Sequence, residues 1–518
     1  MKNLWTGLTV ILAAASFAGT VSADTLTIGT RNETTSIDPH FFQTSSNQQI
    51  NSHTFEYLIE KDEHQNLKTA LAVSWKPISD KVWEIKLRKG VKWSDGSPFT
   101  AADVIANAER AEAGRVKSAS PANRFILGIK HKMIDDHTIH TTNGAVFPLM
   151  ARYLSVAPMI PAKFAMAPTA DYNTGKVAVG TGPYKFVEWI KGDRVVLARN
   201  PDYWGDKPVW DKIVYKTIIK DPSRLAALLS GDVDLIDYVP TTDYKLIKKN
   251  PKLAISEIAG NRVIFLNLDQ RKRPTPYAKT NDGKEMPNPF IKLKVRKAIS
   301  LAINRKAIVD RVMDGAGAPS GQVAAKGMFG YEPSIGADDY DPERSKKLLA
   351  EAGYPDGFTL MVHGPNDRYV NDAKITETVA GMLTRVGIKS QVHTEPKATF
   401  FSNIKDYSLH LLGYGSDTGE ASAALLSLLH TQVKEKNYGG FNKVGYSNPE
   451  FDRPLDKALQ TLDNKNREGL LQDVARVVAK DVSLIPLHYQ VNVWAHRPDL
   501  TYVARTDERT MGMYVTKK

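Results

Sequence analysis

The sequence predicts an α/β protein with two lobes that are joined by two strands. Strand-like and helix-like periods alternate along most of the chain, and the apolar segments 263–268 and 485–492 are typical of buried strands. A chain of 518 residues is also too long for a single hydrophobic core. We expect the chain to cross between the lobes at these two segments. Small backbone rotations at two crossings would let the lobes close over a ligand.

The first 23 residues have the pattern of a cleaved secretory signal peptide. Lys2 is their only charged residue, and an apolar run extends from Leu8 to Ala18. The segment ends in Val21-Ser22-Ala23, whose small residues are typical of a signal-peptide cleavage site. The run is shorter than the about 20 apolar residues that a membrane-spanning helix needs. A retained N-terminal anchor helix is the alternative. Charged or polar residues interrupt every later apolar run, so we expect no transmembrane helix in the mature chain.

Composition excludes several kinds of site. The chain has no cysteine, which excludes disulfides, thiolate metal sites and a lipid-accepting cysteine after the signal. The formal net charge is +12, but the basic residues are spread along the chain and no aromatic residues are interleaved with them. This pattern is typical of a solvated basic surface, and it argues against a nucleic-acid groove.

The segment 71–107 has the clearest local pattern in the chain. Apolar and charged side chains alternate over residues 83–87, which predicts a strand with one buried face. Asp95-Gly96 then predicts a turn, because glycine tolerates the backbone angles of tight reversals. Thr100, with Asp103 three residues later, predicts the capping box of an alanine-rich helix.

Several further elements can be placed in the first part of the chain. Leu26 and Ile28 alternate with threonines and predict a strand, which leads into the polar loop 30–39. In open α/β sheets, a loop that follows the carboxyl end of a strand is the usual position of a ligand. Residues 221–230 predict a helix, with proline in its first turn and glycine directly after it.

The second part of the chain predicts alternating helices and strands. Residues 294–304 and 305–314 are amphipathic and predict two helices. Residues 358–363 predict a strand, and residues 372–386 predict the helix that follows it. The order strand, helix, strand implies a parallel pair of strands and therefore an α/β lobe.

Residues 72–104 carry a long motif, A-x-x-W followed by W-x-I-x-L-R-x-G-V-K-W-S-D-G-x-P-F-T-A-x-D-V. This motif resembles the fingerprint of the large extracytoplasmic solute-binding proteins, family 5, of peptide, opine and nickel ABC importers. The resemblance implies a type II, two-lobe periplasmic binding protein fold with a two-strand hinge and an extra subdomain. It implies a signal peptide at 1–23, lobe I at 24–59, 174–265 and 487–518, an inserted subdomain at 60–173, and lobe II at 266–486.

The resemblance also implies a receptor function. Such a protein would bind a peptide or peptide-like small molecule and deliver it to inner-membrane ABC permease subunits, which are driven by cytoplasmic ATPases. We expect a monomer without cofactor, metal or nucleic acid. An opine, an amino-acid conjugate, a sugar or a metal chelate is the alternative ligand. Without a lipid anchor, the protein would be retained only by an outer membrane, so we expect a periplasmic location.

The loop 413–420 is the most informative candidate site. An apolar strand delivers Gly413 and Gly415, which would allow a ligand to approach the backbone closely. An aspartate in such a loop is more often a turn-former, but the resemblance implies that Asp417 receives the α-ammonium of the ligand. Tyr414 stands where peptide binders usually have tryptophan, which leaves the identity of the ligand open.

Other candidate positions are less specific. Arg368 follows a strand and has the planar guanidinium that suits a carboxylate, although a solvated arginine is equally consistent with its position. The resemblance adds pocket positions at Glu33, Thr34, Thr35, Asn442 and Tyr489. The first three would contact a ligand largely through backbone groups. The alternatives for the last two are a turn asparagine and a half-buried core tyrosine.

No motif predicts an enzyme. The sequence lacks H-E-x-x-H and G-x-S-x-G, and its twelve histidines are scattered singly. Residues 180–185 begin like a nucleotide-binding G-x-G-x-x-G loop but have lysine in place of the third glycine. A secreted hydrolase is the alternative from another functional class, and it would have to assemble its site from distant residues.

Overall fold

The computed structural model describes residues 24–41, 44–115, 120, 123, 125–436 and 438–518. The predicted signal peptide, residues 1–23, lies outside the described residues. Within these described ranges, no helix combines the length and the apolar character that crossing a bilayer would require.

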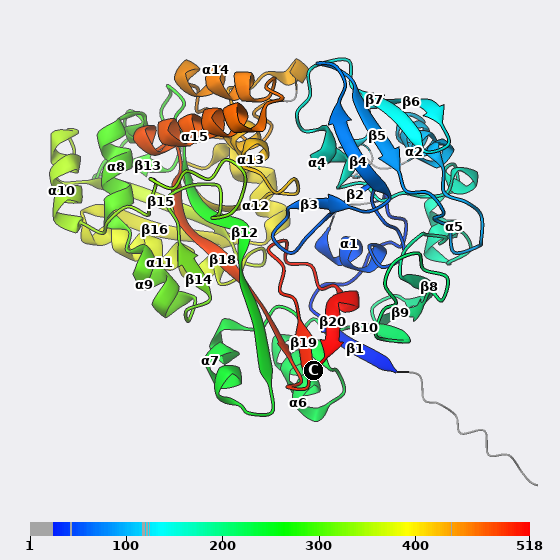
Figure 1. The fold of residues 1–518 in the computed structure, drawn as a ribbon. Helices are drawn as coiled ribbons and strands as arrows, with labels where there is room; N and C mark the ends of the chain where they lie inside the picture. Colours follow the sequence, from blue (N-terminus) through cyan, green and yellow to red (C-terminus); the bar gives the residue numbers. More distant parts are fainter. Residues whose placement is uncertain (1–23, 42–43, 116–119, 121–122, 124, 437) are drawn as a thin grey trace, which may run out of the picture.

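A mixed sheet of twelve strands runs through the whole molecule (Figure 1). One half of the sheet, called the first half below, contains β8 (Tyr184–Ile190), β9 (Arg194–Arg199), β10 (Lys212–Thr217), β1 (Thr25–Thr30) and β11 (Leu235–Ile236). The second half contains β17 (Leu409–Gly415), β15 (Phe358–Pro365), β16 (Ile388–Glu395) and β13 (Ala278–Lys279), with β14 (Gly317–Pro319) paired to β18.

Two long antiparallel strands, β12 (Ala254–Leu268) and β18 (Ile485–His496), connect the two halves (Figure 1). They confirm the predicted crossings, and both extend further than the sequence predicts. The pairing of β12 with β18 is interrupted between Ala259 and Val263. A bulge bends a strand locally and leaves residues unpaired, so this interruption is the natural position of a hinge.

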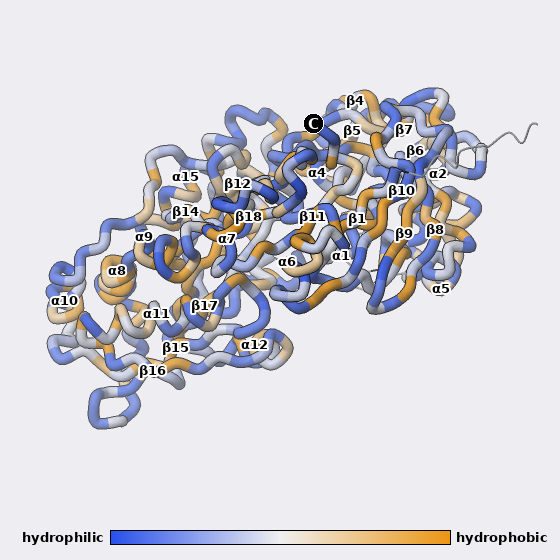
Figure 2. Tube along the Cα trace, turned by 90° about the horizontal axis from the view of Figure 1, so that it is seen from below, coloured by the Kyte–Doolittle hydropathy of each residue, from blue (hydrophilic) through white to orange (hydrophobic). Residues whose placement is uncertain are grey.

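In the second half of the sheet, β17 and residues 263–268 of β12 are mostly buried on both faces, which explains why these strands are largely apolar. Ile264 and Leu266 of β12 belong to the core on one face, whereas Val263 and Phe265 belong to the core on the other. Strands β15 and β16 are parallel, as predicted, with α11 (Asp372–Arg385) between them in sequence. Figure 2 shows the corresponding hydrophobic segments in the strands of both halves.

One predicted helix has a different geometry. Over residues 305–314 the chain forms the single turn α9 (Arg305–Ala307) and then a π-helical segment, η3 (Ile308–Val312). The amide of Met313 donates to the carbonyl of Ile308, five residues earlier. The wider turn places Ile308 and Met313 on the same side, where both are fully buried. Core packing therefore overrides the α-helical period here.

A separate four-stranded sheet lies beside the first half (Figure 1). Its strands, in spatial order, are β4 (Ala72–Pro77), β5 (Trp83–Leu87), β7 (Thr138–Thr142) and β6 (Lys130–Asp135). Helix α2 (Ala101–Glu112) packs against it and has the predicted capping box, in which Asp103 accepts a hydrogen bond of 2.8 Å from the amide of Thr100. The other described strands form two short antiparallel pairs: β2 (Ile59–Lys61) with β3 (Leu67–Thr69), and β19 (Leu500–Tyr502) with β20 (Val515–Lys517).

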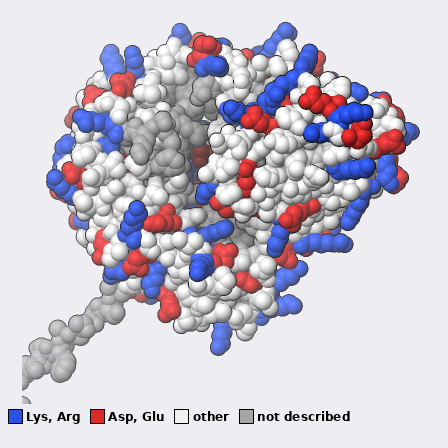
Figure 3. Space-filling model, turned by 180° about the vertical axis from the view of Figure 1, so that it is seen from behind, with Lys and Arg blue, Asp and Glu red and all other residues white. Residues whose placement is uncertain are grey.

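Helices cover the sheets. Those associated with the first half and the separate sheet are α1 (Ser45–Asn51), α4 (Met150–Leu154), α5 (Thr169–Asn173), α6 (Asp221–Ser230) and α7 (Thr241–Lys249). Those of the second half are α8 (Leu293–Ala302), α10 (Pro342–Glu351), α12 (Lys397–Asn403), α13 (Ala421–Leu428), α14 (Pro449–Ala458) and α15 (Asn464–Asp481). On the outer face in Figure 3, Lys and Arg are interspersed with Asp and Glu, which fits the solvated basic surface that composition predicts.

Candidate functional site

A cleft of about 710 Å³ lies between the two halves of the molecule. The first half contributes the loop after β1, the start of α1, and residues near the bulge of β12. The second half contributes residues 367–370 after β15, and residues 412–415 and 417 at the end of β17. Loops at the carboxyl ends of strands thus meet from both sides, as is usual for ligand sites in α/β proteins.

The loop with Asp417 is held firmly against the first half. The amide group of Asn261, in the bulge of β12, donates a hydrogen bond of 2.9 Å to the carbonyl of Ser416. The ammonium of Lys61 donates one of 2.7 Å to the carbonyl of Asp417. The half-buried Asp417 lines the cleft. Side chains from β12 and β2 therefore position the backbone of this loop.

Gly413 is required by packing within the second half. The ring of Tyr369 lies so close that a Cβ atom on Gly413 would be 2.7 Å from its Cε1 atom, and also 2.7 Å from Cδ1 of Ile264. The hydroxyl of Tyr369 donates a hydrogen bond of 3.1 Å to the carbonyl of Gly413. The small residue thus lets a tyrosine pack on β17 beside the cleft, whereas the sequence suggested room for a ligand.

Basic groups of the second half also border the cleft. Arg368 is exposed, and its guanidinium carbon lies 5.0 Å from the ring centroid of Tyr369, a cation–π distance. Its backbone amide is fixed by a 2.9 Å hydrogen bond to the carboxylate of Asp372. The aromatic ring and the fixed backbone hold this arginine beside the cleft, and its predicted contact with a carboxylate remains a prediction.

The cleft contains an ion pair that no sequence pattern predicts. Arg262, the residue before the predicted crossing segment, pairs with Glu508 near the C-terminus. Burial alone would lower the pKa of Arg262, but the attraction of Glu508 outweighs it and raises this pKa. The hydroxyl of Tyr238 also donates to Glu508, at 3.5 Å. Only the position of Arg262 beside a predicted crossing could have signalled a role, because its partner is distant in sequence.

The three candidates in the loop after β1 have different surroundings. Glu33 lines the cleft, and its carboxylate accepts a hydrogen bond of 2.8 Å from the amide of Gly192. Thr34 and Thr35 do not line the cleft. The amide of Thr35 donates to the side-chain oxygen of Asn47 in α1 at 2.8 Å. These threonines anchor the loop, and their predicted ligand contacts remain predictions.

Asn442 and Tyr489 lie outside the cleft. The amide group of Asn442 donates to the carbonyl of Tyr446 at 2.7 Å, and its side-chain oxygen accepts from the amide of Tyr446 at 3.2 Å. The buried hydroxyl of Tyr489 donates to the carbonyl of Gln322 at 2.9 Å. The geometry therefore supports the alternatives of a turn asparagine and a core tyrosine.

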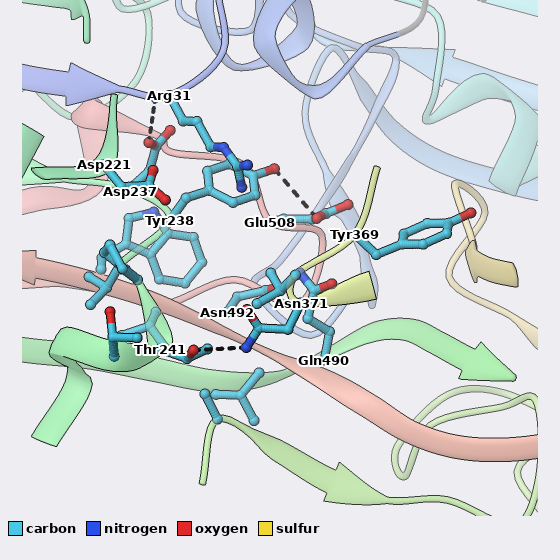
Figure 4. A pocket seen from close by; sticks show the side chains of 18 residues that line it. Arg31, Asp221, Asp237, Tyr238, Thr241, Tyr369, Asn371, Gln490, Asn492 and Glu508 are labelled. Carbon is cyan, nitrogen blue, oxygen red and sulfur yellow. Dashed lines mark hydrogen bonds between the residues drawn. The ribbon is translucent and has the colours of Figure 1, made fainter. Parts of the chain in front are cut away.

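A smaller cavity of about 250 Å³ lies behind the cleft (Figure 4). Arg31, Tyr238, Tyr369 and Glu508 line both spaces, so the cavity continues the cleft toward the hinge strands. The side-chain amide of Asn371 in the second half donates a 2.9 Å hydrogen bond to the hydroxyl of Thr241 in the first half (Figure 4). This bond joins the two halves at the rear of the site.

Charged side chains of both signs thus line a cleft between the two halves, and the connecting strands β12 and β18 border it. Among the described residues, no group of three or more His, Asp or Glu side chains is placed to hold a metal ion. Residues 66–436 match the family model of the bacterial extracellular solute-binding proteins, family 5. The chain belongs to this family.

Relatives of this family-5 protein span nearly its whole length. The glutathione-binding protein GsiB of Pectobacterium atrosepticum is 29% identical, over 97% of this chain and 95% of the relative. The periplasmic binding protein DppA from Helicobacter pylori, solved with the peptide STSA, is 23% identical with a TM-score of 0.76, and the match covers 95% of this chain and 98% of that one.

A dipeptide-binding protein from Pseudoalteromonas sp. SM9913, solved with Met-Leu, has a TM-score of 0.75 at 23% identity and covers 95% of this chain and 100% of that one. At this level of identity, the two solved structures establish the fold of this family-5 protein. The type II, two-lobe architecture predicted from the motif at residues 72–104 is thereby confirmed.

Proposed function

We propose that this family-5 protein is the periplasmic receptor of an ABC importer, and that it closes over a small peptide or peptide-like solute with charged ends. The observation that carries this proposal is the charge of the cleft, which is lined by groups of both signs. The basic residues are Arg31, Arg262, Arg368 and Lys397, and the acidic residues are Glu33, Asp367, Asp417 and Glu508.

A zwitterionic solute matches this distribution. Arg262 and Glu508 already pair with each other, and Glu33 accepts a backbone amide. Asp417 would receive the ammonium of the ligand, and Arg368 would receive its carboxylate. Charge-assisted hydrogen bonds of this kind are about twice as strong as neutral ones, and guanidinium groups bind carboxylates in two-pronged geometry.

The relatives support the same class of ligand, since one is named for binding glutathione and two are solved with short peptides. In this protein, Tyr414 would provide an aromatic wall beside the ligand, and Gly415 would leave room for it. Both residues line the cleft. An opine or another amino-acid conjugate would present similar charges and is the alternative outcome of the test below.

We further propose that the two lobes of the receptor move about a hinge and that membrane permeases recognise its closed form. Lobe I would comprise residues 24–59, 174–265 and 487–518 with the subdomain 60–173 inserted, and lobe II residues 266–486. The bulge of β12 would act as the hinge between them. The closed monomer would be recognised by membrane permeases, since a ligand that touches both lobes shifts the population toward the closed form. It would have no catalytic activity of its own.

Mass spectrometry of the small molecules released when the purified protein is denatured tests this proposal. Release of a peptide, followed by saturable calorimetric binding of the same synthetic peptide to the emptied protein, is the expected result. Release and rebinding of an opine or a sugar would show that this compound, and not a peptide, is the ligand. Conversion of peptides to products during incubation would instead identify a hydrolase.

A further inference from the structure

A separate cavity of about 370 Å³ lies at the end of the large sheet, in the second half of the molecule. It is lined by residues of β15 and β16 and of the segments that precede β13 and β17. None of these residues lines the cleft or the rear cavity. The volume falls in the range of about 300–1,000 Å³ that is usual for small-molecule sites. The cavity is therefore a candidate for a second binding site.

The strand period places several polar groups of this cavity on one face of the sheet. Met361 and His363 of β15 line the cavity, and they alternate with Leu360 and Val362, which belong to the core on the other face. His393 of the parallel strand β16 is paired with His363, and Glu395 follows two residues later. Residues two apart in a strand lie on the same side, so this face presents two imidazoles, a thioether and a carboxylate together.

Aromatic rings form much of the wall. The ring of His363 stacks on the ring of Tyr407, with centroids 4.0 Å apart. Tyr277 contacts His363 edge to face at 4.5 Å, and His393 does the same at 5.6 Å. His363 and Tyr407 are buried, whereas Tyr277 is 37% exposed and His393 is also exposed. The buried pair thus forms the floor of the cavity, and the two exposed rings stand at its rim.

The cavity is acidic although the chain as a whole is basic. Glu395 and Asp406 line it, and among the described residues that line it none is a lysine or an arginine. Burial lowers the pKa of His363 to about 4, so this ring is neutral at neutral pH. Its Nδ1 atom has no hydrogen-bond partner among the described residues, which leaves a buried polar group unused in the floor. The hydroxyl of Tyr407 donates to the carboxylate of Glu395 and fixes its position.

We propose that this cavity binds a small organic ammonium cation between the aromatic rings and the two carboxylates. Aromatic rings attract a cation that lies over their faces, and carboxylates add direct charge attraction. A metal ion matches the cavity less well, since no three His, Asp or Glu side chains of the described residues are placed to hold one. The proposal does not depend on the ligand of the cleft, because the two spaces share no lining residue.

A charged probe and its uncharged analogue test this proposal. Choline carries a quaternary ammonium group, and dimethylbutanol has the same shape with a carbon atom in place of the nitrogen. Calorimetric titration of the whole protein at about pH 8 keeps histidines with ordinary pKa values neutral. Choline is expected to bind saturably, and dimethylbutanol to bind at least about tenfold more weakly.

Two variants show whether choline occupies this cavity. Glu395→Gln removes a charge but can still accept the hydrogen bond from Tyr407, and it should weaken choline binding about tenfold. Tyr277→Ala removes a ring at the rim and should weaken it at least about threefold. Tyr340→Ala is the matched control, because Tyr340 is 41% exposed and does not line the cavity. If Tyr277→Ala does not unfold cooperatively, Tyr277→Leu replaces it.

The cleft provides a further comparison. Asp417→Ala should keep the choline affinity of the natural sequence, because Asp417 lines the cleft and not this cavity. Loss of choline binding in Asp417→Ala would place choline in the cleft and overturn the proposal. No saturable choline binding, equal binding of the two probes, or unchanged affinity in both cavity variants would also overturn it. Zinc binding in place of choline binding would identify a metal site instead. None of these results decides whether the cleft binds a peptide.

Discussion

The ammonium of Lys61 donates a hydrogen bond of 2.7 Å to the backbone carbonyl of Asp417, which is 356 residues further along the chain. Lys61 is 1% exposed, and burial lowers its pKa to about 7. The contact uses the backbone oxygen of Asp417, while Asp417 also lines the cleft. The opposite half of the molecule thus fixes the position of the residue that we expect to bind the ligand.

We expect Asp417→Ala to remove most of the affinity for an amine-bearing peptide. Truncation of one partner in a desolvated charge pair costs about 2–5 kcal/mol of binding, while the bond from Lys61 uses the backbone and can persist. Asp282→Ala, in an exposed loop, is the matched control. Calorimetry that gives the same dissociation constant for Asp417→Ala as for the natural sequence would remove Asp417 from the site.

Gly413→Ala should destabilise the protein, because the added methyl group would meet the ring of Tyr369 and the side chain of Ile264. Overpacking of this kind costs about 1–3 kcal/mol of unfolding free energy. Gly381→Ala is a matched control inside helix α11, where an added Cβ meets nothing within 4 Å. It should stabilise by about 0.5–1 kcal/mol. Urea unfolding measures both, and a neutral Gly413→Ala would contradict the packing argument.

Three histidines lie in register on neighbouring strands of the second half. His363 on β15 is paired with His393 on β16 and with His410 on β17. His410 is fully buried and neither of its ring nitrogens has a hydrogen-bond partner among the described residues. Burial lowers the pKa of His363 to about 4 and that of His410 to about 3.

These shifts predict a loss of stability in acid. The unfolded chain takes up protons on these histidines as the pH falls below about 6.5, whereas the folded protein keeps them neutral until about pH 4 or 3. Unfolding is therefore favoured increasingly as the pH falls through this window. His410→Leu should lose less stability than the natural sequence between pH 7 and pH 5.

The control for this prediction is His64→Leu, whose side chain is 60% exposed in the natural protein. It should keep the full pH dependence. Urea unfolding of all three proteins at pH 7, 6 and 5 provides the comparison, since the carboxylates are the same in each. An identical pH dependence for His410→Leu would show that other groups control acid stability.

Thr241→Val should weaken ligand binding without disrupting either half. It removes the hydroxyl that accepts the 2.9 Å hydrogen bond from Asn371 across the halves. A hydrogen bond contributes about 0.5–1.5 kcal/mol net, so we expect a roughly two- to tenfold loss of affinity if the bond forms on closure. Thr378→Val is the control, because that hydroxyl bonds to Lys374 within the same helix. Equal losses in both variants would contradict a role in closure.

Patterns among neighbouring residues predicted most of the local structure, with residues 305–314 as an exception, and they also indicated the family. The capping box at Thr100 and Asp103, the alternating strand at 83–87 and the helix after Lys220 depend on neighbouring residues, and the structure contains all of them. The two buried crossing strands were also predictable, because a strand buried on both faces must be apolar throughout. The long motif at 72–104 indicated the solute-binding family, which the family model confirms.

Contacts between side chains that are distant in sequence depend on how the elements pack. Arg262 finds Glu508, and Lys61 finds Asp417, only because β12 and β18 bring distant segments to one cleft. The amide group of Asn442 also donates a hydrogen bond of 3.0 Å to the carbonyl of His430, twelve residues earlier, which no local pattern specifies. Periodicity and capping report interactions within about one turn or one strand pair. The lining of a cleft depends instead on how whole elements pack, so it could not be read from neighbouring residues.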